Sequence, residues 1–266
     1  MSFLVGMSTS CVFPSKTETA FKVASELGYD GVEIMVTKDP SSQDARSLNK
    51  FSKKYSIPIF SIHSPVLMMS SHVFGRNPRE KLRRSCELAV ATGASTVVVH
   101  PPYFWQPVYA LTFSSFVREL SAEFDLRIAV ENMFNPEFFG VSLPVFAPSW
   151  DPSSPSMDVD CMTLDFSHCA YQGVSGLDLA KSMGDRLQHI HLCDGTHHHE
   201  RFHLLDEHLV PGRGTQPVAE TLEYLSREGT SFLGFVVAEV HTDSYSKKKR
   251  RRKLVETLEF ARRFLE

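Results

Sequence analysis

The chain has 266 residues, 42% of them hydrophobic and 22% charged, values close to those of average globular proteins. This composition excludes a largely disordered chain. The 28 Lys and Arg residues against 31 Asp and Glu residues give a net charge of −3, so charge alone does not indicate nucleic-acid binding. Because barrels of this length are commonly one domain, we expect a single domain over residues 1–266.

The cysteines and the N-terminal segment predict a cytoplasmic protein. The number of cysteines is odd and none forms a Cys-x-x-Cys pair, so we expect reduced, mostly buried thiols. The N-terminal segment lacks the basic region of a signal peptide, and no apolar run reaches the roughly 18–20 residues of a membrane helix. The sequence does not indicate the oligomeric state. The cysteines are Cys11, Cys86, Cys161, Cys169 and Cys193.

Eight short apolar segments predict β-strands. Each is rich in Val, Ile or Phe and nearly continuous in hydrophobicity, as expected for parallel strands that are covered on both faces. The predicted strands are residues 3–8, 31–36, 57–63, 95–100, 126–132, 161–167, 187–194 and 233–241.

Helix signals alternate with these strands. Residues 15–30 begin at a Ser/Thr cap and end at Gly28, and residues 77–95 carry Pro78 near the first turn and end at Gly93. The alternation predicts an α/β fold, a single (β/α)8 TIM barrel, with a doubly wound open sheet as the alternative. The other predicted helices are residues 177–186, residues 217–229 and a last helix that opens at Lys247.

Two segments interrupt the alternation. Residues 133–160 are rich in Pro and Ser, and residues 195–214 are rich in His. Long irregular connections in a compact domain often cover a functional site.

Acidic and imidazole side chains recur where the predicted strands end. In a barrel the carboxyl ends of all strands open on one face, so we expect these groups to share one cleft. His189 is deeper in its strand than His191, which favours a hydrogen-bonded core residue. The expected cleft residues are Glu33, His63, His100, Glu131, Asp165, His168, His191, Asp206, His208 and Glu239.

Four carboxylates in one cleft need a counter-charge. Repulsion and desolvation would force Glu131, Asp165, Asp206 and Glu239 to take up protons unless a cation were bound. A mixed set of imidazole and carboxylate ligands suits Zn²⁺, Mn²⁺, Fe²⁺ or Co²⁺ better than Ca²⁺. We therefore predict a divalent metal cofactor, zinc or manganese, with one to three ions.

The motifs at these strand ends resemble a known superfamily. They are "GYDGVEIM", "SIHSP", "VVVHPP", "AVENM", "TLDFSH", "HIHLCDG", "DEHLVPGRG" and "VVAEV". Together they resemble the xylose isomerase-like TIM barrels, which include sugar and sugar-phosphate isomerases and epimerases and the DNA-repair enzymes of the endonuclease IV type. The resemblance covers nearly the whole chain.

In the isomerase and epimerase branch, the resemblance implies one metal held by Glu131, Asp165, His191 and Glu239. Glu131 and Glu239 would then be the catalytic pair that moves a proton on the carbon next to a carbonyl. His168 would orient the substrate or a water molecule.

In the endonuclease IV branch, the resemblance implies three zinc ions and hydrolysis of a phosphodiester in abasic DNA. All nine ligand positions are of the right type here. They are His63, His100, Glu131, Asp165, His168, His191, Asp206, His208 and Glu239.

Other features favour a small sugar or sugar phosphate over DNA. A Glu at position 33 is usual in the isomerase branch. The loops that would grip a duplex carry only Lys38, Arg46 and Arg76 as cations, which is a sparse set of phosphate contacts. We expect a nucleic-acid partner only under the endonuclease alternative, and no membrane partner.

Three residues are candidates for substrate contact: Glu33, Arg213 and Trp105. Arg213, in a Gly-Arg-Gly turn, is suited to an anionic substrate, and Trp105 to stacking on a sugar ring. The basic run Lys247–Lys253 opens the last helix, and we expect a solvated helix face or a phosphate contact there.

Overall fold

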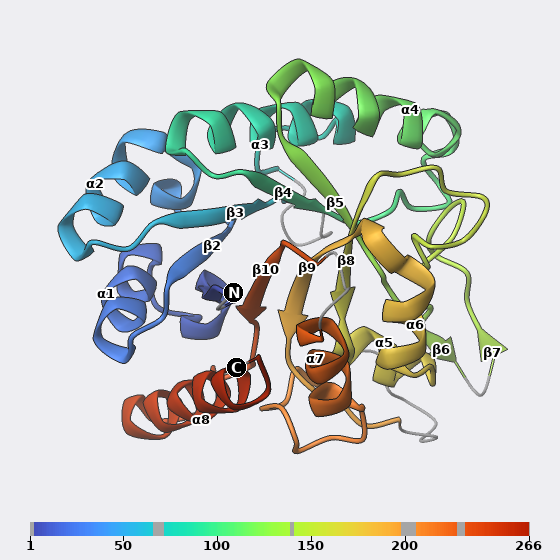
Figure 1. Cartoon of the computed structure of the whole chain (residues 1–266). Helices are drawn as coiled ribbons and strands as arrows, with labels where there is room; N and C mark the ends of the chain where they lie inside the picture. The colour runs from blue at the N-terminus through green and yellow to red at the C-terminus, as the bar shows by residue number, and fades with distance from the viewer. Residues whose placement is uncertain (1–2, 66–71, 139–140, 198–205, 228–231, 266) are drawn as a thin grey trace.

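A computed structural model describes residues 3–65, 72–138, 141–197, 206–227 and 232–265. Eight parallel strands close into a barrel in the order β1-β10-β9-β8-β5-β4-β3-β2 (Figure 1). Because β1 pairs with both β2 and β10, the sheet has no open edge, which confirms the (β/α)8 barrel and excludes the doubly wound sheet. The strands are β1 (Val5–Ser8), β2 (Gly31–Met35), β3 (Ile59–His63), β4 (Thr96–Val99), β5 (Arg127–Glu131), β8 (Cys161–Asp165), β9 (Leu187–Leu192) and β10 (Phe235–Ala238).

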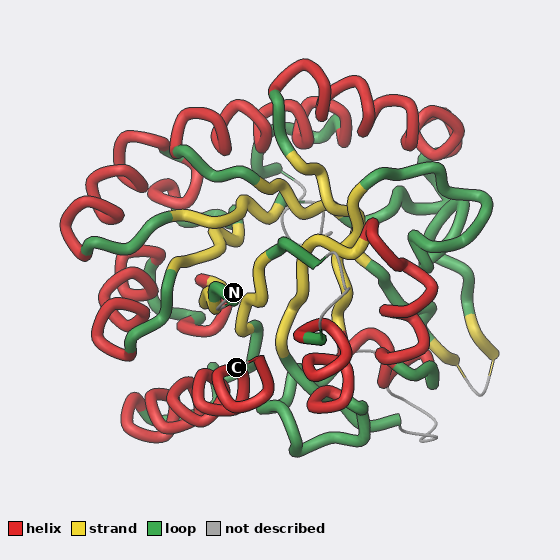
Figure 2. The backbone as a smooth tube through the Cα atoms, in the orientation of Figure 1, coloured by secondary structure: helices red, strands yellow, loops and turns green. Residues whose placement is uncertain are grey.

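The α-helices pack around the outside of the barrel (Figure 2). Within the described residues no α-helix follows β5, whose connection carries the hairpin β6 (Glu137–Phe138) and β7 (Val141–Ser142), whereas two helices follow β8. Short 3-10 helices occur at Thr9–Val12, Pro40–Gln43 and Gly184–Arg186. The α-helices are α1 (Thr17–Leu27), α2 (Ala45–Tyr55), α3 (Pro78–Thr92), α4 (Pro107–Phe124), α5 (Phe166–Gln172), α6 (Gly176–Met183), α7 (Val218–Ser226) and α8 (Lys247–Leu265).

Helix ends follow the glycine signals, but the start of α1 differs from the prediction. Gly28 and Gly93 end α1 and α3 in the left-handed conformation, with φ of 84° and 76°. The predicted Ser/Thr cap of α1 is wrong, because Lys16 precedes the helix without a side-chain cap bond. The carboxylate of Asp39 instead accepts hydrogen bonds from the backbone N–H and hydroxyl of Thr17.

Aromatic stacking fills the amino-terminal end of the barrel. The ring of Phe60 on β3 stacks on that of Phe235 on β10, with ring centroids 4.4 Å apart. A Cβ on Gly31 would lie 2.4 Å from the Phe60 ring, and one on Gly6 would lie 3.0 Å from it. The two glycines therefore make room for the ring that closes this end, which leaves the opposite end for the polar site.

In the part of the chain that the structure describes, no helix has the length and hydropathy needed to cross a membrane.

We predict that Gly31→Ala lowers the free energy of unfolding by about 1–3 kcal/mol, because the added methyl group overlaps the stacked Phe60 ring. The measurement is urea unfolding followed by circular dichroism. Combining Gly31→Ala with Phe60→Leu should cost less than the sum of the two single changes. Strict additivity of the two changes would contradict this packing account.

Candidate metal centre

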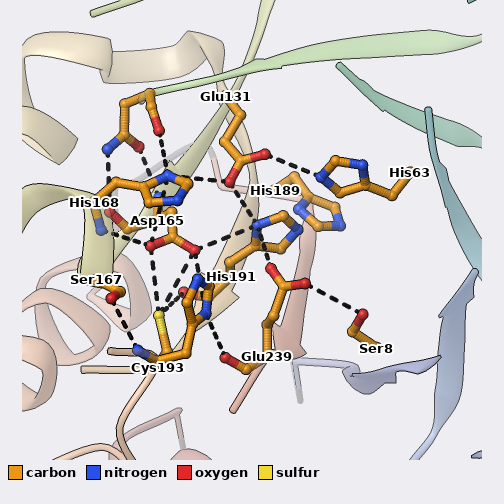
Figure 3. Close-up of polar contacts among 12 residues, drawn as sticks. Ser8, His63, Glu131, Asp165, Ser167, His168, His189, His191, Cys193 and Glu239 are labelled. Carbon is orange, nitrogen blue, oxygen red and sulfur yellow. Dashed lines mark hydrogen bonds and ion pairs between the residues drawn. The ribbon is translucent and has the colours of Figure 1, made fainter. Parts of the chain in front are cut away.

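Four side chains from four strands meet at the carboxyl end of the barrel. Glu131 ends β5, Asp165 ends β8, His191 is in β9 and Glu239 follows β10 directly. One ligand atom from each lies within 4.8 Å of the others. Nδ1 of His191 is 3.0 Å from Glu131 Oε1 and 2.9 Å from Glu239 Oε2 (Figure 3). We call these residues the four-ligand group, and all four are buried.

Asn132 positions two neighbours of this group. Its amide oxygen accepts a hydrogen bond from the Asp165 backbone N–H at 2.7 Å, and its amide nitrogen donates to the Asp165 carbonyl at 3.1 Å. Its own carbonyl is 2.8 Å from Nδ1 of His168. These contacts join the ends of β5 and β8 where the ligands project.

Asp165 also ends its strand by capping the next helix. Its carboxylate accepts a hydrogen bond from the His168 backbone N–H, which makes it the N-cap of α5. The predicted strand over residues 161–167 is therefore too long, and Phe166 and Ser167 belong to the helix. This cap brings His168 back toward the cleft.

A second group of potential ligands contains His63, His100 and Glu131. Nε2 of each histidine is 3.1 Å from Oε2 of Glu131, and all three side chains are buried. His63 ends β3 and His100 follows β4, as the sequence predicts. Glu131 is shared with the four-ligand group, so the two groups are contiguous.

A third group contains His168, Asp206 and His208. Asp206 Oδ2 is 3.4 Å from His168 Nε2 and contacts Nε2 of His208. His208 has a φ of 43°, an uncommon conformation for a residue other than glycine. Its N–H donates to Ser167 Oγ at 3.0 Å, and its Nδ1 is 2.8 Å from the Glu239 carbonyl. A strained backbone of this kind persists only where surrounding contacts hold it in place. Strained residues are common at functional sites.

Asp194 explains the Gly-Arg-Gly turn that follows the third group. Its buried carboxylate accepts hydrogen bonds from the N–H groups of Gly212 and Gly214, each at 2.9 Å. Its backbone also exchanges two hydrogen bonds with Leu209, the residue after His208. A Cβ on Gly214 would lie 2.3 Å from the Asp194 carboxylate. The glycines thus allow the loop that carries Asp206 and His208 to close around one carboxylate.

The electrostatics of the cleft couple its acids to its histidines. Burial opposes ionisation of Glu131, but the charges of His191 and His100 lower its pKa well below the usual range. Burial likewise opposes protonation of His168, yet the charge of Asp165 raises its pKa to about 9. Protonated imidazoles therefore balance the acids, and a divalent cation can take over that role. The donor set of carboxylates and imidazoles fits such a cation.

Two of the three predicted substrate contacts, Trp105 and Arg213, lie in loops and contact other side chains. Trp105 is half exposed and stacks on Tyr103 with ring centroids 4.5 Å apart. Tyr103 stacks in turn on Phe146, which joins the loop after β4 to the long connection after β5. Arg213 makes a two-oxygen ion pair with Glu256 of α8. The substrate-binding roles of Trp105 and Arg213 stay predictions.

Glu33 is fully buried in β2. Its carboxylate is 3.1 Å from His189 Nε2 and 3.2 Å from His191 Nε2, and it accepts a hydrogen bond from Ser61 at 2.7 Å. His189 is a buried core histidine, as its depth in the strand predicts. Direct contact between Glu33 and substrate stays a prediction.

Several side chains of the basic run Lys247–Lys253 contact the protein itself. Arg250 donates to the carbonyls of Val12 and Phe13, and Arg251 pairs with Glu26. The buried Lys253 lies over the ring of Tyr245. These contacts account for part of the run without a phosphate ligand.

Sequence reasoning missed the residues that support the ligands. Asn132 and Asp194 follow strands closely, and this position is the only sequence signal that could have indicated them. Their hydrogen-bond partners, Asp165 for Asn132 and the two glycines for Asp194, are distant in sequence. Cys193 Sγ is 3.5 Å from Asp165 Oδ1, and the His241 ring lies 4.6 Å from that of His208. Nothing in the local sequence distinguishes these two residues from core or surface positions.

Comparison with known proteins identifies the family. Residues 21–264 match the family described as xylose isomerase-like TIM barrel. The chain belongs to this family. Uncharacterized proteins of Mycobacterium leprae (strain TN) and Mycobacterium tuberculosis (strain H37Rv) are each 44% identical to this xylose isomerase-like barrel, over 98% of the chain and 97% of their own lengths.

Solved structures share the fold at low sequence identity. A D-tagatose 3-epimerase-like protein is 23% identical, with both chains fully covered and a TM-score of 0.66. A D-allulose 3-epimerase from Methylomonas sp. in complex with D-allulose is 14% identical over 99% of this chain and 97% of its own, with a TM-score of 0.67. The IolI protein with a bound zinc atom is 15% identical over 100% of this chain and 98% of its own, with a TM-score of 0.71.

We predict that the metal-free barrel loses stability as the pH rises from 6.5 to about 9. The folded state raises the pKa of His168 above its ordinary value of 6.5, so it binds this proton more tightly than the unfolded chain does. The stabilisation is complete below pH 6.5 and disappears as the pH passes about 9. Urea unfolding of chelator-treated protein at several pH values measures it.

His168→Gln should show a weaker decline over the same pH range. An equal decline in the wild type and in this variant would contradict the assignment to His168.

Proposed function

We propose that the protein is a metal-dependent isomerase or epimerase that acts on a sugar or a sugar phosphate. The observation that carries this proposal is the four-ligand group, in which two glutamates flank an aspartate and a histidine at the mouth of the barrel. Glu131 and Glu239 come from β5 and from the end of β10, and β8 and β9 lie between them in the barrel. Two carboxylates set apart around one centre suit proton transfer at a carbon between them.

A divalent cation held by the four-ligand group would polarise the carbonyl oxygen of a bound substrate. One glutamate accepts the proton from the carbon next to that carbonyl. The other glutamate, carrying a proton, donates it to the opposite face of the same carbon in an epimerisation. In an isomerisation the proton is delivered to the former carbonyl carbon, and the hydroxyl proton of the first carbon passes to the former carbonyl oxygen. His168 orients the substrate, since its Nδ1 is held by the Asn132 carbonyl and its Nε2 faces the cleft beside Asp206.

Two comparisons support the proposal at the level of chemical class. Structures sharing the fold include a D-tagatose 3-epimerase-like protein, a D-allulose 3-epimerase and a D-psicose 3-epimerase, the last solved in the presence of D-fructose. The zinc atom of the IolI structure supports zinc as the first metal to test. The half-exposed ring of Trp105, in the loop after β4, is a candidate stacking surface for a sugar.

We predict that Glu239→Gln lowers turnover of the responsive substrate by at least about 100-fold, because a general acid–base group contributes 10²–10⁴-fold. The assay incubates zinc- or manganese-loaded protein with ketoses including D-allulose, D-tagatose and D-fructose in D2O. Mass spectrometry should find deuterium at the reacting carbon. Glu119→Gln, at an exposed position on α4, is the matched control and should keep wild-type activity.

Retention of activity by Glu239→Gln would contradict its catalytic role. Turnover without deuterium in the product would contradict proton transfer through a solvent-exchangeable carboxyl.

The second and third ligand groups favour one alternative, a multinuclear zinc phosphodiesterase that acts on abasic DNA. Three contiguous groups can hold three ions, and a multinuclear centre suits phosphodiester cleavage. The sparse cations of the early loops are the argument against a duplex substrate.

Asp206→Ala separates the two functions. In the isomerase we expect it to be nearly silent, because Asp206 lies outside the four-ligand group and His168 keeps its contact with the Asn132 carbonyl. In the phosphodiesterase the same change removes a ligand of the third group, so about one metal ion per chain and most activity should be lost. Elemental analysis and cleavage of an abasic-site duplex with added zinc measure both effects. Metal-dependent nicking by the wild type would favour the phosphodiesterase.

A further inference from the structure

Glu33 occupies a layer of the barrel below the four-ligand group. It comes from β2, which is separated from β9 by β1 and β10, so its side chain reaches across the interior to the histidines of β9. Glu33, His189 and His191 are each 0% exposed. A carboxylate in this position has no surface for a substrate to contact, and its burial needs another explanation.

The explanation follows from the two nitrogens of His191. Nδ1 faces the carboxylates of the four-ligand group, at 2.9 Å from Glu239 and 3.0 Å from Glu131 (Figure 3). Nε2 points the other way and is 3.2 Å from Oε1 of Glu33. Both Nε2 and this oxygen are buried, and neither has a hydrogen-bond partner among the described residues. At 3.2 Å, each atom is in place to be the partner of the other.

The second oxygen of Glu33 is held in place by other groups. Oε2 accepts a hydrogen bond from Ser61 Oγ at 2.7 Å and is 3.1 Å from Nε2 of His189. These contacts leave Oε1 directed at His191. A histidine that binds a metal through one nitrogen carries its proton on the other, and a carboxylate beside that proton fixes the tautomer and the ring orientation.

We propose that Glu33 is a positioning residue, which holds the proton on His191 Nε2 and thereby directs Nδ1 at the metal of the four-ligand group. In this proposal Glu33 acts through His191, and this role replaces the direct substrate contact that the sequence predicts for it. The inference rests on the metal centre of the proposed function but not on the reaction that this centre performs. It applies equally to one bound ion and to three.

Zinc affinity tests this role without any substrate. Zinc is titrated into chelator-treated wild type, Glu33→Gln and Thr96→Val in competition with a chromophoric chelator. Glu33→Gln keeps the side-chain shape but loses the charge, and it should weaken zinc binding about 10–100-fold, the usual effect of removing such a partner. Thr96→Val is the matched control: the Thr96 hydroxyl is fully buried and has no hydrogen-bond partner among the described residues. It should bind zinc like the wild type.

Each result of the titration decides a separate point. Equal zinc affinity for Glu33→Gln and the wild type would overturn the positioning role and leave the metal centre intact. An equal loss in Thr96→Val would overturn it too, because the effect would then come from the disturbed core. A wild type that binds no zinc would overturn the metal centre and the inference together.

Nitrogen-15 NMR of the imidazoles in zinc-loaded wild type supplies a second test, which does not depend on a variant that folds. His191 should show a protonated Nε2 and a metal-bound Nδ1. A metal-bound or unprotonated Nε2 would contradict the proposal.

Discussion

The structure depends on the charge balance of one buried cleft. Glu33, Glu131, Asp165 and Glu239 are almost completely buried, and histidine side chains are the cations nearest to them. Several nearby carboxylates cannot remain ionised in a low dielectric without positive charge. In the metal-free chain burial opposes protonation of His168 and His191, but the nearby acids raise the pKa of both, which favours their protonated, positively charged forms. A divalent cation would supply positive charge with imidazoles and carboxylates as its ligands. The stability of this xylose isomerase-like barrel and the activity proposed for it therefore involve the same groups.

The barrel builds the cleft in layers along its axis. At the amino-terminal end, Phe60 and Phe235 stack and fill the interior. Above them, Glu33 and His189 form a buried polar layer under His191. The ligand groups form the next layer, at the carboxyl ends of the strands. Rigid strands position the four-ligand group, whereas the third group depends on a loop closed around Asp194.

Strand periodicity and strand-end position are local signals, and they predicted the barrel and a cleft of acidic and imidazole groups. The resemblance to the superfamily then indicated nine of these groups as potential ligands. Glu131, Asp165 and Glu239 could be found by asking which acids end apolar segments. The supporting contacts could not be found in that way. Asn132 holds a residue 33 positions away, and Glu33 reaches a histidine across the barrel. Such partners depend on how strands are arranged around the closed sheet. The strand predicted through Ser167 was too long because the capping role of Asp165 depends on a backbone turn.

The most direct test is a crystal structure of the protein grown with zinc or manganese, with anomalous scattering to locate the ions. The account predicts a peak bonded to Glu131, Asp165, His191 Nδ1 and Glu239 at about 2.0–2.3 Å. Additional peaks at the second and third groups would be compatible with it. Side chains that remain paired with one another, with no ion at the four-ligand group despite an excess of metal, would contradict the central claim.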